Sequence, residues 1–153
     1  MTNTSPSLTS PPPAVVLDTN IVFDWLVFDN AGCRPLIDAV ESGRLRWLAT
    51  QDMRDELAHV LGRGVLAAWS PDESRLWSTW DRLACMVTAP PGSLAPRLRC
   101  GDPDDQKFVE LALAQAQWLI SRDRAVLKLA KRAAALGVHI VTPERWVMLH
   151  TGA

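Results

Sequence analysis

The chain has 153 residues and a formal net charge of −1, with 48% hydrophobic and 22% charged residues. This size and composition fit a single globular domain with a sizeable core. The nearly neutral charge excludes attraction of a polyanion by overall charge, so any nucleic-acid contact must come from a local basic patch or from metal ions.

Three cysteines, Cys33, Cys85 and Cys100, are widely separated and form no CxxC motif. Their odd number and spacing argue against a disulfide framework or a zinc knuckle and for a reducing compartment. No apolar run reaches the roughly 18 residues of a membrane span. The first 13 residues have neither the basic nor the apolar region of a signal peptide, so we expect a cytoplasmic protein.

Residues 1–13 are rich in Pro, Ser and Thr and have no hydrophobic periodicity, which predicts a flexible tail. A single domain is then predicted over residues 14–150. Its first segment, "AVVL" at 14–17, predicts a buried strand. A helix is expected next with Asn20 as its N-cap, and residues 34–43 predict a second helix that ends at a glycine.

Residues 44–49 predict the second strand, and residues 50–64 predict a helix with apolar side chains on one face. A further helix is expected over residues 71–84, with Pro71 in its first turn, where proline is favoured. Residues 84–88 predict the third strand.

Residues 89–101 contain several prolines and glycines and predict a loop. Residues 102–117 predict a helix whose acidic start suits the positive end of the helix dipole. The fourth strand is expected at residues 118–123, a helix over residues 124–137, and the last strand at residues 138–142.

Predicted strands and helices therefore alternate along the domain. Such alternation implies right-handed crossovers and a mostly parallel sheet covered by helices on both faces, which is a three-layer α/β fold. Ligands of such sheets bind beyond the carboxyl ends of the strands, where the strand order reverses. Asp18 directly follows the first predicted strand and is expected at this rim.

Four carboxylates can reach the rim. Asp18 and Asp123 end predicted strands. Asp105 stands in the first turn of a predicted helix, and Glu56 borders the apolar face of another. Converging carboxylates cannot all stay ionised without compensating positive charge, and divalent cations that prefer oxygen ligands supply it. Each residue also has a structural alternative, as a helix cap, a partner of the helix dipole or a solvated side chain.

The segments that carry these carboxylates resemble the PIN-domain ribonucleases, in particular the toxin components of toxin–antitoxin systems. The matching segments, in chain order, are "VVLDTNIV", "MRDELAHVL", "GDPDDQKFVELALAQA" and "WLISRDRAVL". The resemblance covers nearly everything from Val15 to Pro143. It implies a parallel five-stranded sheet of order 3-2-1-4-5 and an acidic pocket that binds Mg²⁺ or Mn²⁺.

The resemblance also implies which residues build the pocket. The metal-binding and catalytic carboxylates are expected to be Asp18, Glu56, Asp105 and Asp123. Asp105 is preferred to Asp104 because the family's aspartate lies seven residues before an alanine that is matched here by Ala112. Asp102 is a candidate for a supporting position behind the ligands.

Polar and basic side chains are expected to assist these carboxylates. The resemblance gives Asn20 and Ser121 as supporting polar groups. Arg122 and Arg124 flank Asp123 at positions where the family commonly has small or neutral residues, and they are expected to contact substrate phosphates. Further candidates for phosphate contacts follow along the same predicted helix, at Lys128, Lys131 and Arg132.

The implied activity is that of a Mg²⁺- or Mn²⁺-dependent endoribonuclease that cuts single-stranded RNA, with a cognate antitoxin protein as partner and a homodimer as a common assembly. Two alternatives stay open: a non-catalytic PIN-like binding module, and a housekeeping RNA-processing nuclease.

Three other α/β classes of protein are disfavoured. A haloacid-dehalogenase-type phosphatase needs an aspartate where Asn20 stands, a receiver domain needs one after the third strand, and a P-loop enzyme needs a glycine-rich loop ending in Lys-Ser/Thr.

Overall fold

The computed structural model describes residues 11–90 and 98–151. Within them, five strands form one parallel sheet in the order β3-β2-β1-β4-β5. The strands are β1 (Ala14–Leu17), β2 (Arg46–Ala49), β3 (Ala84–Met86), β4 (Trp118–Ile120) and β5 (His139–Val141). The predicted α/β class and strand order are confirmed, and the order reverses at β1.

β1 lies at the centre of the sheet because all of its residues are apolar and buried. Val16 is paired with Leu48 of β2 on one side and with Leu119 of β4 on the other. A strand buried on both faces is a continuous apolar run without alternation, as "AVVL" is. Beyond the strand, the N–H of Asp18 donates to the carbonyl of Ile120 (3.1 Å), so the ends of β1 and β4 lie level.

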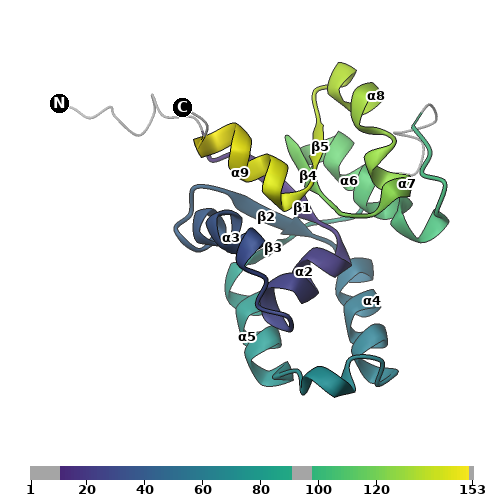
Figure 1. The fold of residues 1–153 in the computed structure, drawn as a ribbon. Helices are drawn as coiled ribbons and strands as arrows, with labels where there is room; N and C mark the ends of the chain where they lie inside the picture. Colours follow the sequence, from purple (N-terminus) through teal and green to yellow (C-terminus); the bar gives the residue numbers. More distant parts are fainter. Residues whose placement is uncertain (1–10, 91–97, 152–153) are drawn as a thin grey trace.

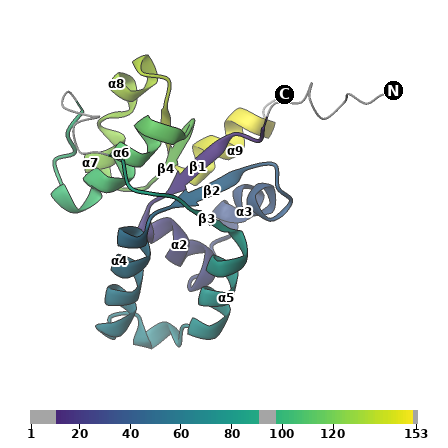
Figure 2. The ribbon, with the colours of Figure 1, turned by 180° about the vertical axis from the view of Figure 1, so that it is seen from behind.

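Helices cover both faces of the sheet. In Figure 1, α3 and α9 lie in front of the strands and α6 lies behind them, and Figure 2 shows the reverse. α4 and α5 extend away from the sheet and are connected at their far ends. The helices are α2 (Thr19–Leu26), α3 (Arg34–Glu41), α4 (Gln51–Gly62), α5 (Glu73–Leu83), α6 (Gln106–Gln115), α7 (Arg124–Leu127), α8 (Ala130–Ala135) and α9 (Pro143–Thr151), with 3₁₀ turns at Ala31–Cys33, Ala67–Trp69 and Pro103–Asp105.

Three tryptophans fix the helices α2 and α5 to the sheet. Trp47 of β2 is 1% exposed, and its ring centroid lies 5.5 Å from that of Trp25 and 4.9 Å from that of Trp80. The rings meet in tilted and edge-on arrangements, which aromatic pairs prefer. This tryptophan stack therefore packs α2, through Trp25, and α5, through Trp80, against Trp47 of β2.

Two helices begin at residues other than those predicted. Asp18, and not Asn20, is the N-cap of α2, because the extended backbone of Asp18 directs its carboxylate at the N–H of Asn20 (2.9 Å). Pro71 lies before α5, not in its first turn. Asp72 caps that helix by accepting a hydrogen bond from the N–H of Arg75 (3.0 Å).

The C-terminal half departs further from the prediction. The predicted helix over 124–137 is divided into α7 and α8, because the chain turns at Leu129 so that this side chain is buried in the core. The predicted helix over 102–117 begins as the 3₁₀ turn Pro103–Asp105. α9 was not predicted at all, and strands three to five end earlier than expected.

Parts of two predicted segments fall outside the described residues. Of the predicted tail over 1–13, residues 1–10 are not described, and of the predicted loop over 89–101, residues 91–97 are not described. Among the residues that are described, no helix combines the length and the apolar character that crossing a membrane requires.

We expect the tryptophan stack to be a main source of stability. Trp47→Ala should lower the free energy of unfolding by about 3–5 kcal/mol, because it leaves a cavity among buried rings. Trp69→Ala is a matched control, since Trp69 is 55% exposed, and it should cost about 1 kcal/mol or less. Urea denaturation followed by circular dichroism measures both. Equal losses in the two variants would contradict this account of the core.

Candidate metal centre

Two aspartates stand where β1 and β4 end, and each of them also caps a helix. Asp18 accepts from the N–H of Asn20 (2.9 Å) at the start of α2, and Asp123 accepts from the N–H of Ala125 (2.8 Å) at the start of α7. Aspartate is favoured at N-caps because its carboxylate satisfies N–H groups that have no partner within the helix. In both residues Oδ1 makes the cap, which leaves Oδ2 for contacts within the site.

Ser121 connects these two aspartates. Its hydroxyl donates to Oδ2 of Asp18 (2.7 Å) and accepts from the backbone N–H of Asp123 (3.0 Å), and the residue is completely buried. The serine expected as a supporting polar group therefore lies between two candidate ligands. Asn20, the other expected supporting group, contributes its backbone N–H and lines the adjacent cleft.

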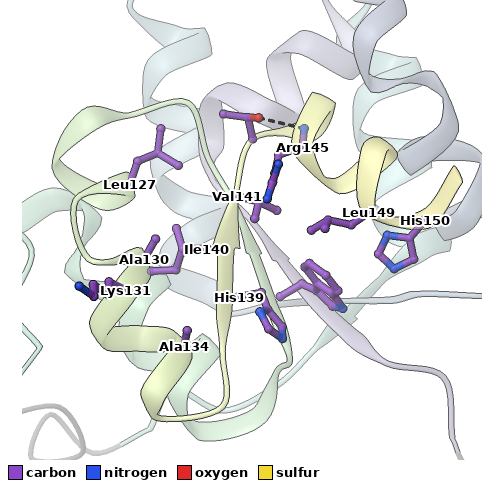
Figure 3. A pocket seen from close by; sticks show the side chains of 12 residues that line it. Leu127, Ala130, Lys131, Ala134, His139, Ile140, Val141, Arg145, Leu149 and His150 are labelled. Carbon is purple, nitrogen blue, oxygen red and sulfur yellow. Dashed lines mark hydrogen bonds between the residues drawn. The ribbon is translucent and has the colours of Figure 1, made fainter. Parts of the chain in front are cut away.

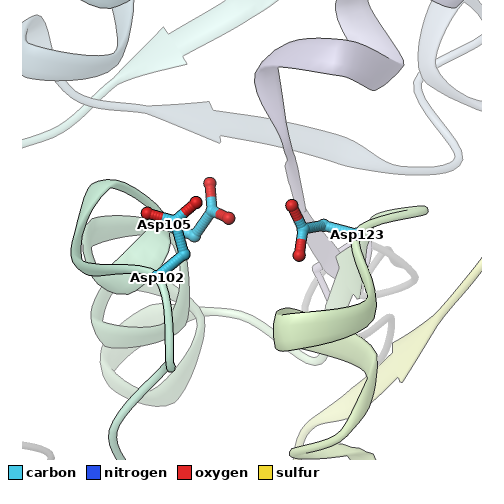
Figure 4. Close-up of side chains that lie close together, drawn as sticks. All are labelled: Asp102, Asp105 and Asp123. Carbon is cyan, nitrogen blue, oxygen red and sulfur yellow. The ribbon is translucent and has the colours of Figure 1, made fainter.

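Three aspartates form an acidic cluster among the described residues. Asp102, Asp105 and Asp123 each offer one carboxylate oxygen, and these oxygens all lie within 4.8 Å of one another. Figure 4 shows Asp102 and Asp105 on one side, next to the start of α6, with the carboxylate of Asp123 facing them from the start of α7. Asp102, which the sequence placed behind the ligands, is thus brought in beside Asp105.

Ionisation is unfavourable in this cluster. The pKa of Asp105 is raised to about 7, mainly by burial and further by the negative charges of Asp18, Asp123 and Asp102. Burial also raises the pKa of Asp18, against the opposing effect of its hydrogen bonds from Ser121 and Asn20. A bound cation removes such a penalty, and an oxygen-only donor set suits Mg²⁺ or Mn²⁺. The residues present therefore fit a divalent metal ion.

Glu56, the fourth predicted carboxylate, has different partners. It lies on α4, where its Oε2 accepts from the hydroxyl of Thr19 (2.5 Å) and its Oε1 forms an ion pair with Lys107 of α6. The structure thus brings Asp105 and Asp123 together and places Asp18 close enough to influence Asp105. Glu56 shares their cleft but is not part of the three-aspartate cluster.

These side chains open into an acidic cleft of about 770 Å³. Asp18 is not among the residues that line it and is only 3% exposed. The cleft is large enough for a phosphodiester together with cations. Its lining residues are mostly carboxylates, with a few basic side chains: Asn20, Asp52, Asp55, Glu56, His59, Val60, Arg63, Asp102, Asp104, Asp105, Lys107 and Asp123.

The two arginines that flank Asp123 differ in their surroundings. Arg122 donates from Nε to Asp24 (2.7 Å) and from both Nη atoms to Glu144 (2.6 and 2.8 Å). The hydrogen bonds with Glu144 raise the pKa of Arg122 and lower that of Glu144. Arg122 therefore joins α2 to α9, whereas Arg124 is exposed at the start of α7.

A second hollow, of about 650 Å³, runs along β5 between α8 and α9 (Figure 3). Apolar side chains line most of it, and the basic side chains of Lys131 and Arg145 stand among them. No carboxylate is found among its lining residues. It therefore lacks the carboxylate ligands that suit Mg²⁺ or Mn²⁺, although His139 and His150 line it.

Residues 14–125 match a family model described as PIN domain. The matched part contains β1 to β4 and every carboxylate of the cleft, whereas β5 and α9 lie beyond it. No curated protein and no solved structure matches the chain.

The raised pKa of Asp105 predicts how stability depends on pH when metal is absent. The unfolded chain releases this proton near pH 4, but the folded protein keeps it up to about pH 7. Because the folded state binds more protons in this range, Asp105 makes stability fall as pH rises from about 4 to about 7. Asp105→Asn should remove this fall and be more stable than the wild type at pH 8.

Urea denaturation of chelator-treated protein at several pH values measures the effect. Asp38→Asn, at an exposed position on α3, is the matched control and should follow the wild type. If the difference between Asp105→Asn and the wild type does not change with pH, Asp105 is not the crowded carboxyl described above.

Proposed function

Because this chain belongs to the PIN-domain family, we propose that it is a Mg²⁺- or Mn²⁺-dependent endoribonuclease that hydrolyses single-stranded RNA. PIN domains are generally metal-dependent nucleases, and the choice of RNA is our proposal. The observation that carries it is the cluster of Asp102, Asp105 and Asp123 at the carboxyl ends of the central strands, inside an acidic cleft.

In this proposal, Asp102, Asp105 and Asp123 would hold the metal, with the buried Asp18 close to Asp105 and with Glu56 on the opposite side of the cleft. When bound, the cation lowers the pKa of an attacking water and neutralises charge on the phosphate. The hydroxyl of Ser121 is committed to Asp18 and to the N–H of Asp123, so it positions ligands and is no nucleophile. Since Asp105 has a pKa of about 7, it must give up its proton before it binds metal.

We place the phosphate contact at Arg124 and give Arg122 a structural role. Arg124 is exposed next to Asp123, so its guanidinium can reach an RNA backbone that enters the cleft. The guanidinium of Arg122 already donates hydrogen bonds to Asp24 and Glu144. An exposed arginine next to an acidic cleft supplies local positive charge that the whole chain, at −1, does not.

The biological role that we propose is that of the toxin in a toxin–antitoxin pair, acting in the cytoplasm. The resemblance of the four sequence segments to that branch supports it over a housekeeping nuclease. Met148 and Leu149 on α9 are 60% and 51% exposed and offer apolar surface for a homodimer.

Expression should arrest growth of a bacterial host, and a small protein encoded next to the gene should relieve the arrest. Growth unaffected by the active enzyme would favour the housekeeping alternative.

Asp123→Asn should abolish cleavage of a labelled single-stranded RNA in Mn²⁺, with a rate loss of at least about 100-fold, since it removes ligand charge. Asparagine caps helices as well as aspartate does, so the circular dichroism spectrum should be unchanged. Asp38→Asn should cleave like the wild type. Cleavage in EDTA, or full activity of Asp123→Asn, would refute the metal-dependent mechanism and leave a binding module as the better description.

Arg124→Ala should weaken RNA binding and lower the slope of log affinity against log salt by roughly one, because one phosphate contact is lost. Fluorescence anisotropy in EDTA measures binding without cleavage. Arg75→Ala, at an exposed position on α5, is the control and should leave the slope unchanged. An unchanged slope for Arg124→Ala would exclude Arg124 from the RNA path.

A further inference from the structure

Lys107 lies at a helix end that disfavours a cation. It is in the first turn of α6 (Gln106–Gln115), where the helix dipole presents its positive end. Its side chain is nevertheless only 26% exposed and lines the acidic cleft. Local helix chemistry does not explain a half-buried ammonium at this position, so its partners must be in the cleft.

Those partners are the carboxylate of Glu56 on α4 and a backbone carbonyl next to Asp105. The ammonium of Lys107 forms an ion pair with Oε1 of Glu56 and donates to the carbonyl of Asp104. The other oxygen of Glu56 accepts from the hydroxyl of Thr19 (2.5 Å). Both oxygens of this carboxylate are therefore occupied by groups of the chain itself.

The opposite side of the cleft has no such compensation. Within the described residues, no ion pair with a basic side chain is found for Asp102, Asp105 or Asp123. The cleft therefore has two unlike sides. On the Glu56 side, the ammonium of Lys107 neutralises the carboxylate, whereas on the aspartate side no side-chain cation of the described residues pairs with the three carboxylates.

We infer that Lys107 acts as a fixed cation that withholds Glu56 from metal binding and limits the centre to a single divalent ion on the aspartate side. Paired metal sites hold two ions about 4 Å apart, each needing its own share of carboxylate oxygens. A second ion would have to displace the ammonium from Glu56 or bind next to it, and like charges at that distance repel strongly. Lys107 is therefore a positioning residue. The inference rests on the proposed metal-dependent function.

The test counts the Mn²⁺ ions bound per chain, by titrating metal-free protein and following free Mn²⁺ by electron paramagnetic resonance. The wild type should bind about one ion. Lys107→Gln, which keeps most of the side chain's length and removes its charge, should bind about two. The double variant Lys107→Gln with Glu56→Gln should return to about one, because the released carboxylate is gone. Arg75→Gln, with the same charge change away from the cleft, should bind about one.

Circular dichroism and thermal unfolding of each variant check that it is folded, because Lys107→Gln also removes the ion pair with Glu56. Two ions bound by the wild type, or one ion bound by Lys107→Gln, would overturn the role of Lys107 and leave the nuclease proposal standing. A wild type that binds no Mn²⁺ would instead overturn the proposed function itself.

Discussion

Repulsion among carboxylates is the constraint around which this site is arranged. β1 and β4 end level with each other, and the chain places an aspartate after each of them, with Asp105 facing both. The pKa of Asp105 is raised to about 7, first because burial disfavours the charged carboxylate and then because Asp18, Asp123 and Asp102 repel it. The surrounding fold must supply the stability that the cluster lacks, and it does so with the buried central strand and the tryptophan stack.

Local backbone structure partly offsets the same repulsion. Asp18, Asp102 and Asp123 each accept a backbone N–H at the start of a helix or 3₁₀ turn. At Asp18 this contact opposes the rise in pKa that burial causes, and in all three residues it fixes the direction of the carboxylate. Ser121 adds a hydroxyl between Asp18 and Asp123. The capping hydrogen bonds therefore have two effects. They stabilise the starts of the helices, and they hold the carboxylates in the positions that the metal centre needs.

The sequence predicts the part of this arrangement that depends on short-range patterns. An apolar run that ends in a carboxylate was sufficient to place Asp18 at the carboxyl end of a central strand. The strand order itself came from the resemblance, because alternation of strands and helices is compatible with several orders. The caps were partly missed, since Asn20 follows Asp18 so closely that either could begin the helix.

Contacts between distant residues could not be predicted in the same way. The pairing of Lys107 with Glu56 depends on how α4 and α6 approach each other across the cleft, which neither segment reveals alone. Arg122 is predicted from the sequence to bind phosphate because α9, which supplies Glu144, is not among the predicted helices. Asp102 joins Asp105 only because the chain enters α6 through a 3₁₀ turn, and an unbroken helix was expected there.

The central claim is that these aspartates converge on one divalent ion, and stability as a function of Mg²⁺ tests it without any substrate. Thermal unfolding in EDTA and then in rising Mg²⁺ should show the wild type gaining about 2.7 kcal/mol at a hundredfold excess over the dissociation constant. Asp123→Asn should gain much less at the same concentrations, and Asp38→Asn should gain as much as the wild type. Equal gains in all three proteins, or none in any, would contradict the convergent metal centre.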